Sequence, residues 1–196
     1  LVLHIRDNLI SNCKILVNSI EVEINYMFDE ILGKVQAQFS DLDYIMVSLG
    51  PGSYTGTRVG LAAAKAIAIS INKPIFGYTN FKAIYNQGIV DSLISSKSNT
   101  GIIIKASKYD AYYQQIENNF FSNYKVLSIN DLNSDSLMCE KTLGNYSKID
   151  EIKNYYFCLP KKESIFKIFL KYLENKNNYE NKNLEPLYIK GHYAEK

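Results

Sequence analysis

The segment Gly50-Pro51-Gly52-Ser53-Tyr54-Thr55-Gly56 separates two strongly patterned stretches of this sequence. Before it, residues 44–49 (YIMVSL) form an apolar run rich in β-forming residues, which predicts a buried strand. After it, residues 57–71 predict a helix that Asn72 closes, and residues 75–78 predict another strand. The order strand, helix, strand predicts a right-handed parallel crossover and therefore an α/β fold.

The glycine-rich segment itself is compatible with two roles. Glycines allow positive φ angles and close backbone approach, and a helix N-terminus offers free N–H groups to an anion. Its spacing is GxGxxxG rather than the dinucleotide-binding GxGxxG, and no Gly-Lys-Ser/Thr follows as in a Walker A loop. A structural turn and a phosphate cradle are therefore about equally consistent with the residues. We expect Ser53 and Thr55 to serve as caps or turn residues, because the segment is not a GxSxG nucleophile elbow.

The helix expected over residues 57–71 is apolar around most of its circumference. One narrow line carries its polar residues, Arg58, Lys65 and Asn72. Another side carries Gly60, Ala63 and Ile67. A helix that packs only on its own sheet needs a single apolar stripe. The pattern therefore predicts either a fully buried core helix or a helix with a second contact surface, against another subunit.

An earlier helix is expected over residues 19–33 (SIEVEINYMFDEILG), with Asn18 and Glu21 as a capping box and Gly33 just beyond its end. Its core stripe recurs at helical spacing: Ile20, Ile24, Met27, Phe28, Ile31 and Leu32. Val22 and Tyr26 lie one turn apart on another side. On a solitary domain these two side chains would be exposed.

The remaining patterns fill the chain with short elements. We expect strands at residues 1–6 and 14–17, a helical stretch at 81–94, a hairpin of 101–106 with 111–117, a helix at 163–173, and a closing extended segment at 184–193. This order fits two α/β lobes better than one.

Composition excludes several classes of protein. Of 196 residues, 46% are hydrophobic and 21% charged, as in ordinary globular proteins. A net charge of +2 does not indicate a protein that binds nucleic acid mainly through its own positive electrostatic potential. No apolar run is long enough to span a bilayer and no leader pattern is seen, so we expect a cytoplasmic protein without a membrane partner. Cys13, Cys139 and Cys158 are widely separated and predict neither a disulfide framework nor a zinc site.

Residues 50–68 (GPGSYTGTRVGLAAAKAIA) resemble the GPGSFTG-type signature and following helix of the TsaB (YeaZ) family. Residues 19–32, 41–50 and 184–194 resemble further segments of that family in the same order. The resemblance implies an actin-like ATPase fold of two ribonuclease-H-like lobes, here residues 1–80 and 81–196. The family usually opens with a strand that carries an Asp-Thr-Ser turn, and this sequence begins at Leu1 after that point. We therefore expect the first strand of the N-terminal lobe to be missing.

The resemblance also implies a function. Family members are non-catalytic scaffolds that bind and activate a TsaD-type catalytic subunit. With a TsaE-type ATPase, that pair transfers threonylcarbamoyl to the adenosine 3′ to the anticodon of tRNA. For this chain the resemblance implies that no residue is catalytic or binds a cofactor or metal. It implies that ATP is used only by the assembled complex, which also contacts the tRNA. It further implies that the chain forms a homodimer when it is alone. The residues expected at the partner interface are Val22, Tyr26, Gly56, Gly60, Leu61, Ala63, Ala64 and Ile67.

The enzymatic alternative is a stand-alone actin-like nucleotide phosphotransferase or hydrolase, with a glycoprotease-like peptidase as a weaker variant. Metal-dependent members of the wider superfamily use paired histidines at helical spacing, whereas this chain has only His4 and His192, near its two ends. Asp41, Asp43 and Asp110 are the acids that a nuclease-type site could pair. Nucleotide turnover by the isolated chain would separate the two hypotheses, because a scaffold predicts none.

Overall fold

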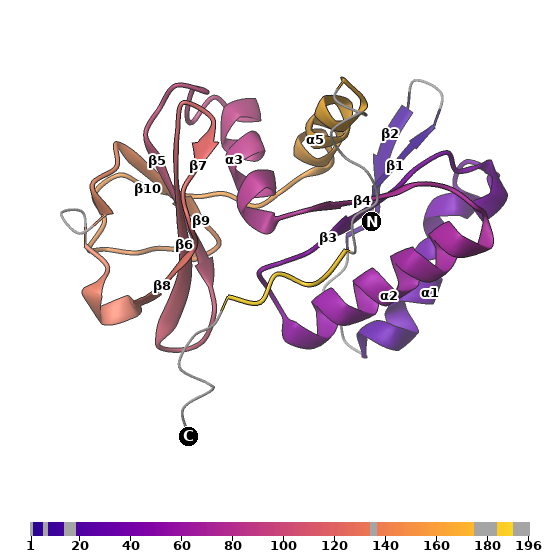
Figure 1. Ribbon diagram of the computed structural model, residues 1–196, viewed down its shortest axis with the longest axis horizontal. Helices are drawn as coiled ribbons and strands as arrows, with labels where there is room; N and C mark the ends of the chain where they lie inside the picture. The colour runs from indigo at the N-terminus through magenta and orange to yellow at the C-terminus, as the bar shows by residue number, and fades with distance from the viewer. Residues whose placement is uncertain (1, 6–7, 14–18, 134–136, 175–183, 190–196) are drawn as a thin grey trace.

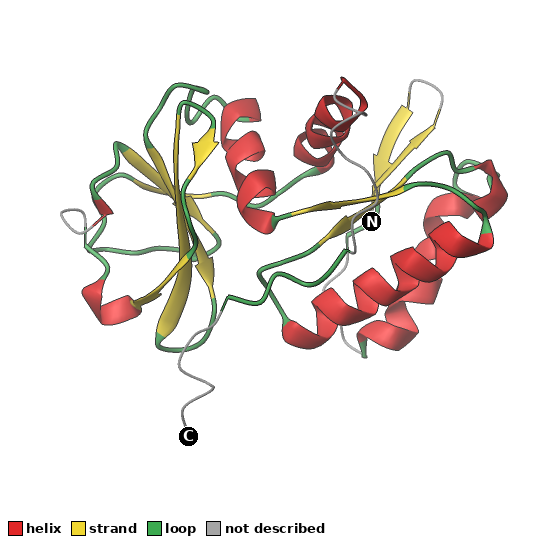
Figure 2. Cartoon of the chain, in the orientation of Figure 1, coloured by secondary structure: helices red, strands yellow, loops and turns green. Residues whose placement is uncertain are grey.

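The computed structural model describes residues 2–5, 8–13, 19–133, 137–174 and 184–189. In this part of the chain, helices and strands alternate between residues 20 and 105, and several strands then follow one another before the last helix (Figures 1 and 2). The expected α/β class is confirmed. The division at residue 80 stays a prediction.

A parallel pair of strands forms the centre of the first half of the chain. β3 (Ile45–Ser48) pairs with β4 (Ile75–Tyr78), and α2 (Tyr54–Ser70) connects them. α2 packs Leu61 and Ala64 against Val47 of β3. The predicted crossover of two parallel strands is therefore confirmed, but the helix begins three residues earlier than expected, inside the glycine-rich segment.

The N-terminal residues form a hairpin and a helix. β1 (Val2–Ile5) is antiparallel to β2 (Asn8–Ser11), and α1 (Ile20–Gly33) follows. The strand that pairs with β1 thus lies at residues 8–11, and the strand expected at residues 14–17 falls outside the described residues, as does Asn18 of the expected capping box. Ser19 occupies the N-cap position of α1 without a side-chain cap hydrogen bond.

The second half is built on one mixed sheet. Its strand order is β10 (Tyr155–Phe157), β9 (Lys141–Gly144), β5 (Thr100–Lys105), β6 (Asp110–Glu117) and β7 (Phe120–Phe121), and β8 (Lys125–Ser128) also pairs with β6. The predicted hairpin is confirmed as β5 and β6. α3 (Asn80–Val90) packs on this sheet, with Phe81 and Tyr85 buried among Ile102, Ile116 and Leu143.

The helix α5 (Lys162–Glu174) returns to the first half. Phe166 stacks on His4 of β1, with 4.4 Å between ring centroids, and Ile168 is buried with Phe76 of β4 and Ala83 of α3. Figure 1 shows α5 on one side of the β3–β4 pair and α1 and α2 on the other. α5 therefore covers one face of this pair and α2 covers the opposite face, while Ile31 and Leu32 of α1 pack with Leu3 of β1.

The packing of α5 gives a stability prediction. Ile168 is fully buried, so Ile168→Ala should lower the free energy of unfolding by about 2–5 kcal/mol through lost transfer energy and a cavity. Leu170→Ala on the exposed side of the same helix should cost less than about 1 kcal/mol. Urea denaturation followed by circular dichroism measures both. Equal losses in the two variants would mean that α5 is not anchored through Ile168.

Candidate partner-binding surface

The signature loop, residues 50–56, connects β3 to α2. Gly50 has a φ of +91°, a conformation that favours glycine. Ser53 is the N-cap residue, and its Oγ accepts a hydrogen bond of 3.2 Å from the Gly56 N–H. Tyr54, Thr55 and Gly56 form the first turn of α2. The expectation that Ser53 caps the helix is confirmed, whereas Thr55 belongs to the helix itself.

Asn80, the first residue of α3, holds this loop in place. Its Nδ2 donates to the Pro51 carbonyl at 2.9 Å, and its Oδ1 accepts from the Ser48 hydroxyl at 2.8 Å. Its backbone N–H donates to the Gly50 carbonyl at 2.6 Å. These bonds satisfy the polar groups of a tight turn and favour the structural turn over the phosphate cradle. Sequence reasoning missed Asn80, because its side-chain partners Ser48 and Pro51 lie 32 and 29 positions earlier in the chain.

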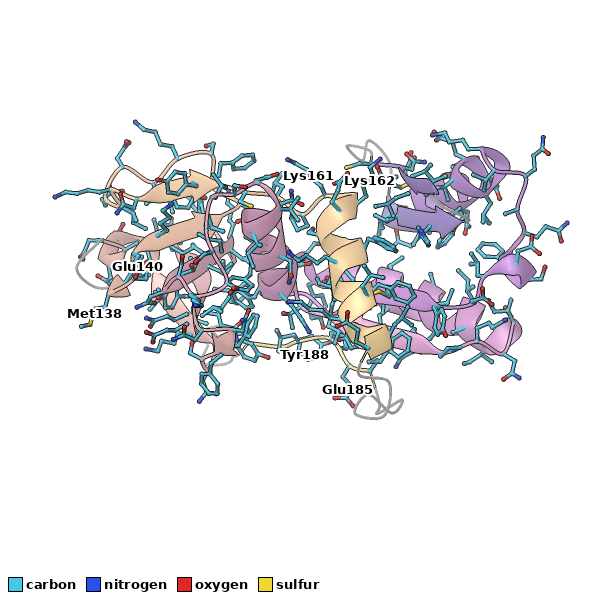
Figure 3. All side chains as sticks on the ribbon, turned by 90° about the horizontal axis from the view of Figure 1, so that it is seen from above. Met138, Glu140, Lys161, Lys162, Glu185 and Tyr188 are labelled. Atoms are coloured by element: carbon cyan, nitrogen blue, oxygen red, sulfur yellow. The ribbon has the colours of Figure 1, made fainter. Side chains whose placement is uncertain are left out.

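The C-terminal residues 184–189 pack against the same region. The Leu187 N–H donates to the Leu49 carbonyl at 2.7 Å, and Leu184 joins the core beneath α2. The Arg58 guanidinium lies 3.8 Å from the Tyr54 ring centroid, and Arg58 Nε donates to the Tyr188 hydroxyl at 2.8 Å. Tyr188 is labelled in Figure 3. The N-terminal turn of α2 is thus fixed by Ser53 of the signature loop and by Tyr188 of the C-terminal segment.

α1 and α2 contact each other along one face of the molecule (Figure 1). Tyr26 of α1 is 63% exposed, and Val22, one turn before it, is also exposed. On α2, Gly60, Ala63 and Ile67 are partly buried. A Cβ added to Gly60 would meet no atom within 4 Å, so open space lies beside this glycine. These positions leave room for another helix.

Two residues of the expected interface belong to the chain's own core. Leu61 is 4% exposed and Ala64 is 7% exposed, and both pack on Val47. The expectation that they contact a partner is corrected, because the sheet-facing side of α2 already buries them. The other expected interface positions, Val22, Tyr26, Gly56, Gly60, Ala63 and Ile67, stay a prediction.

The exposed side of α2 contains apolar residues that sequence reasoning left out of the interface. Ile69 is 80% exposed, and Ala62 and Ala66 are exposed as well. Their signal was present in the sequence, since Ala62 and Ile69 fall beyond the polar line of the helix. Ala62, Ala66 and Ile69 recur at helical spacing and form one exposed apolar stripe, and such a patch is typical of a surface that another protein covers.

The two helices carry opposite charges on their exposed sides. α1 presents Glu21, Asp29 and Glu30, whereas α2 presents Arg58 and Lys65. Hydrogen bonds to the carboxylate from the Glu21 backbone N–H and from Ser19 lower the pKa of Glu21, so this acid stays charged at neutral pH. A partner surface with the complementary order of charges would be aligned by these groups.

The acids weighed for catalysis have separate structural roles. Asp41 accepts a hydrogen bond from the Gln38 N–H, Asp43 pairs with Lys73 at 3.2 Å, and Asp110 accepts from the Ser107 hydroxyl at 3.1 Å. His4 stacks on Phe166, and His192 lies outside the described residues. Within the described ranges, no group of three or more His, Cys, Asp or Glu residues is placed to hold a metal ion, and no helix is long and apolar enough to cross a membrane.

Comparison with known proteins places this chain in a family. The family model for TsaD, tRNA N6-adenosine threonylcarbamoyltransferase, matches residues 17–158. The chain belongs to the TsaD family.

Individual proteins and solved structures show which members of the family this chain is most like in name and fold. The TsaB protein of Buchnera aphidicola from Acyrthosiphon pisum is 24% identical over 77% of this chain and 74% of its own length. An uncharacterized protein of Mycobacterium tuberculosis is 40% identical over 55 residues, so this chain covers 26% of that relative. YeaZ from Pseudomonas aeruginosa superposes with a TM-score of 0.75 at 14% identity, over 96% of this chain and 92% of that one. The expected TsaB (YeaZ) resemblance and its actin-like fold are confirmed.

The loop geometry gives a second prediction. Asn80→Ala removes a donor and an acceptor from partly buried partners, so it should lower the free energy of unfolding by about 1–3 kcal/mol. Asn25→Ala, on the exposed side of α1, should change it by less than about 0.5 kcal/mol. Thermal and urea unfolding measure the difference. If Asn80→Ala is as stable as Asn25→Ala, the side chain of Asn80 does not hold the loop.

Proposed function

We propose that the chain is a non-catalytic scaffold that binds and activates a TsaD-type catalytic subunit for N6-threonylcarbamoylation of the adenosine 3′ to the anticodon of tRNA. Its membership of the TsaD family supports a role in the biosynthesis of threonylcarbamoyladenosine in tRNA. The observation that carries the scaffold role is the exposed apolar side of α1 and α2, which includes Tyr26 and Ile69.

The physical argument for a partner rests on the small residues of α2. The axes of packed helices lie about 8–10 Å apart, and they reach the short end of this range only where the side chains between them are small. Gly60 and Ala63 provide such a place, and Val22, Tyr26 and Ile67 would supply apolar contacts around it. A TsaD-type subunit of the same family offers an equivalent pair of helices, so the two subunits can associate about a pseudo-two-fold axis. When that subunit is absent, a second copy of this chain takes the same place.

The rest of the proposal concerns cofactors and further partners. The isolated chain needs no cofactor or metal, and ATP is consumed by the complex after a TsaE-type ATPase joins. A net charge of +2 supplies few phosphate contacts, so tRNA is held by the assembled complex rather than by this chain. The chain acts in the cytoplasm, where tRNA is modified.

A charged residue at Gly60 tests the interface. Gly60→Arg should weaken binding to the TsaD-type subunit by about 3 kcal/mol or more, because the arginine separates the helices and is buried without a partner. The fold should be kept, since a side chain at this position enters open space and glycine is itself a poor helix former. Isothermal titration calorimetry measures binding, and circular dichroism checks folding. Ser147→Arg, on an exposed loop of the second sheet, is the matched control. Wild-type affinity in a folded Gly60→Arg protein would remove Gly60 from the interface.

Depletion of the protein in its own cell tests the pathway. Threonylcarbamoyladenosine should fall in tRNAs that read codons starting with A, because the catalytic subunit loses its activator. Nucleoside mass spectrometry of bulk tRNA measures this level, and re-expression of the wild-type chain should restore it. Gly60→Arg should restore it poorly and Ser147→Arg fully. An unchanged level, in a cell with no second copy of the gene, contradicts the proposal.

A further inference from the structure

Arg58 lies near the start of α2, one turn before the exposed apolar stripe of Ala62, Ala66 and Ile69. Residues four positions apart are neighbours on a helix surface, so Arg58 and Ala62 lie side by side. Figure 1 shows the C-terminal segment, residues 184–189, passing the start of this helix. The apolar stripe of α2 therefore has a cation at the end that is nearest the signature loop and the C-terminal segment.

Two exposed tyrosines fix the orientation of the Arg58 guanidinium. The guanidinium carbon lies 3.8 Å from the ring centroid of Tyr54 and 5.5 Å from that of Tyr188. Arg58 Nε donates a hydrogen bond of 2.8 Å to the Tyr188 hydroxyl, and the two ring centroids are 6.2 Å apart. Tyr54 is 61% exposed and Tyr188 is 55% exposed. The arginine is therefore ordered at the surface before a partner arrives, so binding costs it little side-chain entropy.

Most of the hydrogen-bond donors in this cluster are unused. A guanidinium has five N–H donors, and the bond to Tyr188 uses one of them. Among the residues that the structure describes, no carboxylate forms an ion pair with Arg58, and its terminal nitrogens make no further hydrogen bond. Because the Tyr188 hydroxyl accepts from Nε, its own proton is left to donate elsewhere. Arg58 and Tyr188 thus offer adjacent donors for an acceptor from another molecule.

The surroundings of Arg58 favour a carboxylate over the phosphates of a nucleic acid. Binding to a phosphate backbone uses several cations that follow the strand. The next cation along α2 is Lys65, two turns away, whereas α1 presents the acids Glu21, Asp29 and Glu30. A single planar guanidinium instead matches the two oxygens of one carboxylate. Tyrosine and arginine are also enriched among the residues that contribute most to binding between proteins.

We propose that Tyr54, Arg58 and Tyr188 form an anchoring site for one acidic side chain of the partner subunit. This inference rests on the proposed function, because it assigns a binding group to the subunit that α1 and α2 contact. The terminal nitrogens of Arg58 bind the two carboxylate oxygens, and the Tyr188 hydroxyl donates to the same group. The apolar stripe supplies contact area, while the ion pair fixes which end of the partner's helix lies beside the signature loop. The C-terminal segment thereby takes part in partner recognition.

Isothermal titration calorimetry of the chain with the TsaD-type subunit tests the anchoring site. Arg58→Met should weaken binding about tenfold or more, because the charged hydrogen bonds are lost while the apolar stem is kept. Arg58→Lys should recover only part of the affinity, because an ammonium cannot form two parallel bonds to a carboxylate. Lys65→Met removes the same charge from the same helix and is the matched control, for which we expect a loss of about threefold or less.

Two further measurements separate recognition from a local structural contact. Tyr188→Phe keeps the ring and removes only the hydroxyl, so the thermal midpoint should change by less than about 2 °C while binding weakens. The affinity of the wild type should also fall more steeply with sodium chloride than that of Arg58→Met, because the variant lacks the ion pair. A purely structural role would lower the midpoint and leave the salt dependence unchanged, which overturns the inference.

A double-mutant cycle identifies the partner acid. Each Asp and Glu on the contacting helices of the TsaD-type subunit is changed to Asn or Gln. One of these changes should weaken binding of the wild type and leave binding of Arg58→Met unaltered. If Arg58→Met does not fold by circular dichroism, Arg58→Lys and Tyr188→Phe replace it, and wild-type affinity in both overturns the inference.

The outcomes distinguish this inference from the proposed function. If the wild type binds the subunit and a folded Arg58→Met binds it equally tightly, the anchoring site is wrong and the scaffold role stands. If Arg58→Met binds the subunit normally but its complex binds tRNA less tightly, the arginine contacts a phosphate, and the inference is wrong. If the wild type does not bind the subunit, the scaffold role and the anchoring site are both wrong.

Discussion

The hydrogen bonds of Asn80 join the ends of two parallel strands to the starts of two helices. Because Asn80 binds Ser48, Gly50 and Pro51, the chain leaves β3 in a fixed direction and α2 starts at a fixed point above the sheet. That starting point determines which side of α2 meets Val47 and which side remains open. The surface proposed to bind a partner is therefore set by a polar contact beneath it, at the first residue of a different helix.

The way in which helices cover the β3–β4 pair explains why one apolar side of α2 remains exposed. α5 crosses from the second half of the chain and packs Ile168 and Tyr172 on Phe76, so one side of the pair is covered within the chain. On the other side, α2 contributes Leu61 and Ala64 and still has apolar residues on its far side. A single layer of helices cannot bury both sides of α2, because nothing in the described chain lies beyond it. An additional subunit is the simplest way to complete that layer.

Local sequence patterns predicted the helices and strands, but they did not predict the features that depend on contacts between residues far apart in the sequence. The alternation and apolar runs of β3, β4, β5 and β6 are visible in the sequence because burial determines them directly. The pairing of Asn80 with Pro51 joins residues 29 positions apart and leaves no periodic signal. Helical periodicity also did not show which side of α2 faces the sheet, because this helix is apolar on most sides. Leu61 and Ala64 face the sheet, whereas Gly60 does not.

The position of residues 184–189 has a consequence for synthesis on the ribosome. Leu184 packs beside Val47, while Leu187 and Ile189 pack against the cluster around Phe81. These residues emerge after both sheets have been made, yet the edge beside Leu49 is closed only when Leu187 arrives. The first half of the chain must therefore wait for nearly all of the second before its packing is complete. Arg58 and Tyr54 contact Tyr188 of the same segment, so the start of α2 can take its final form only after this segment has left the ribosome.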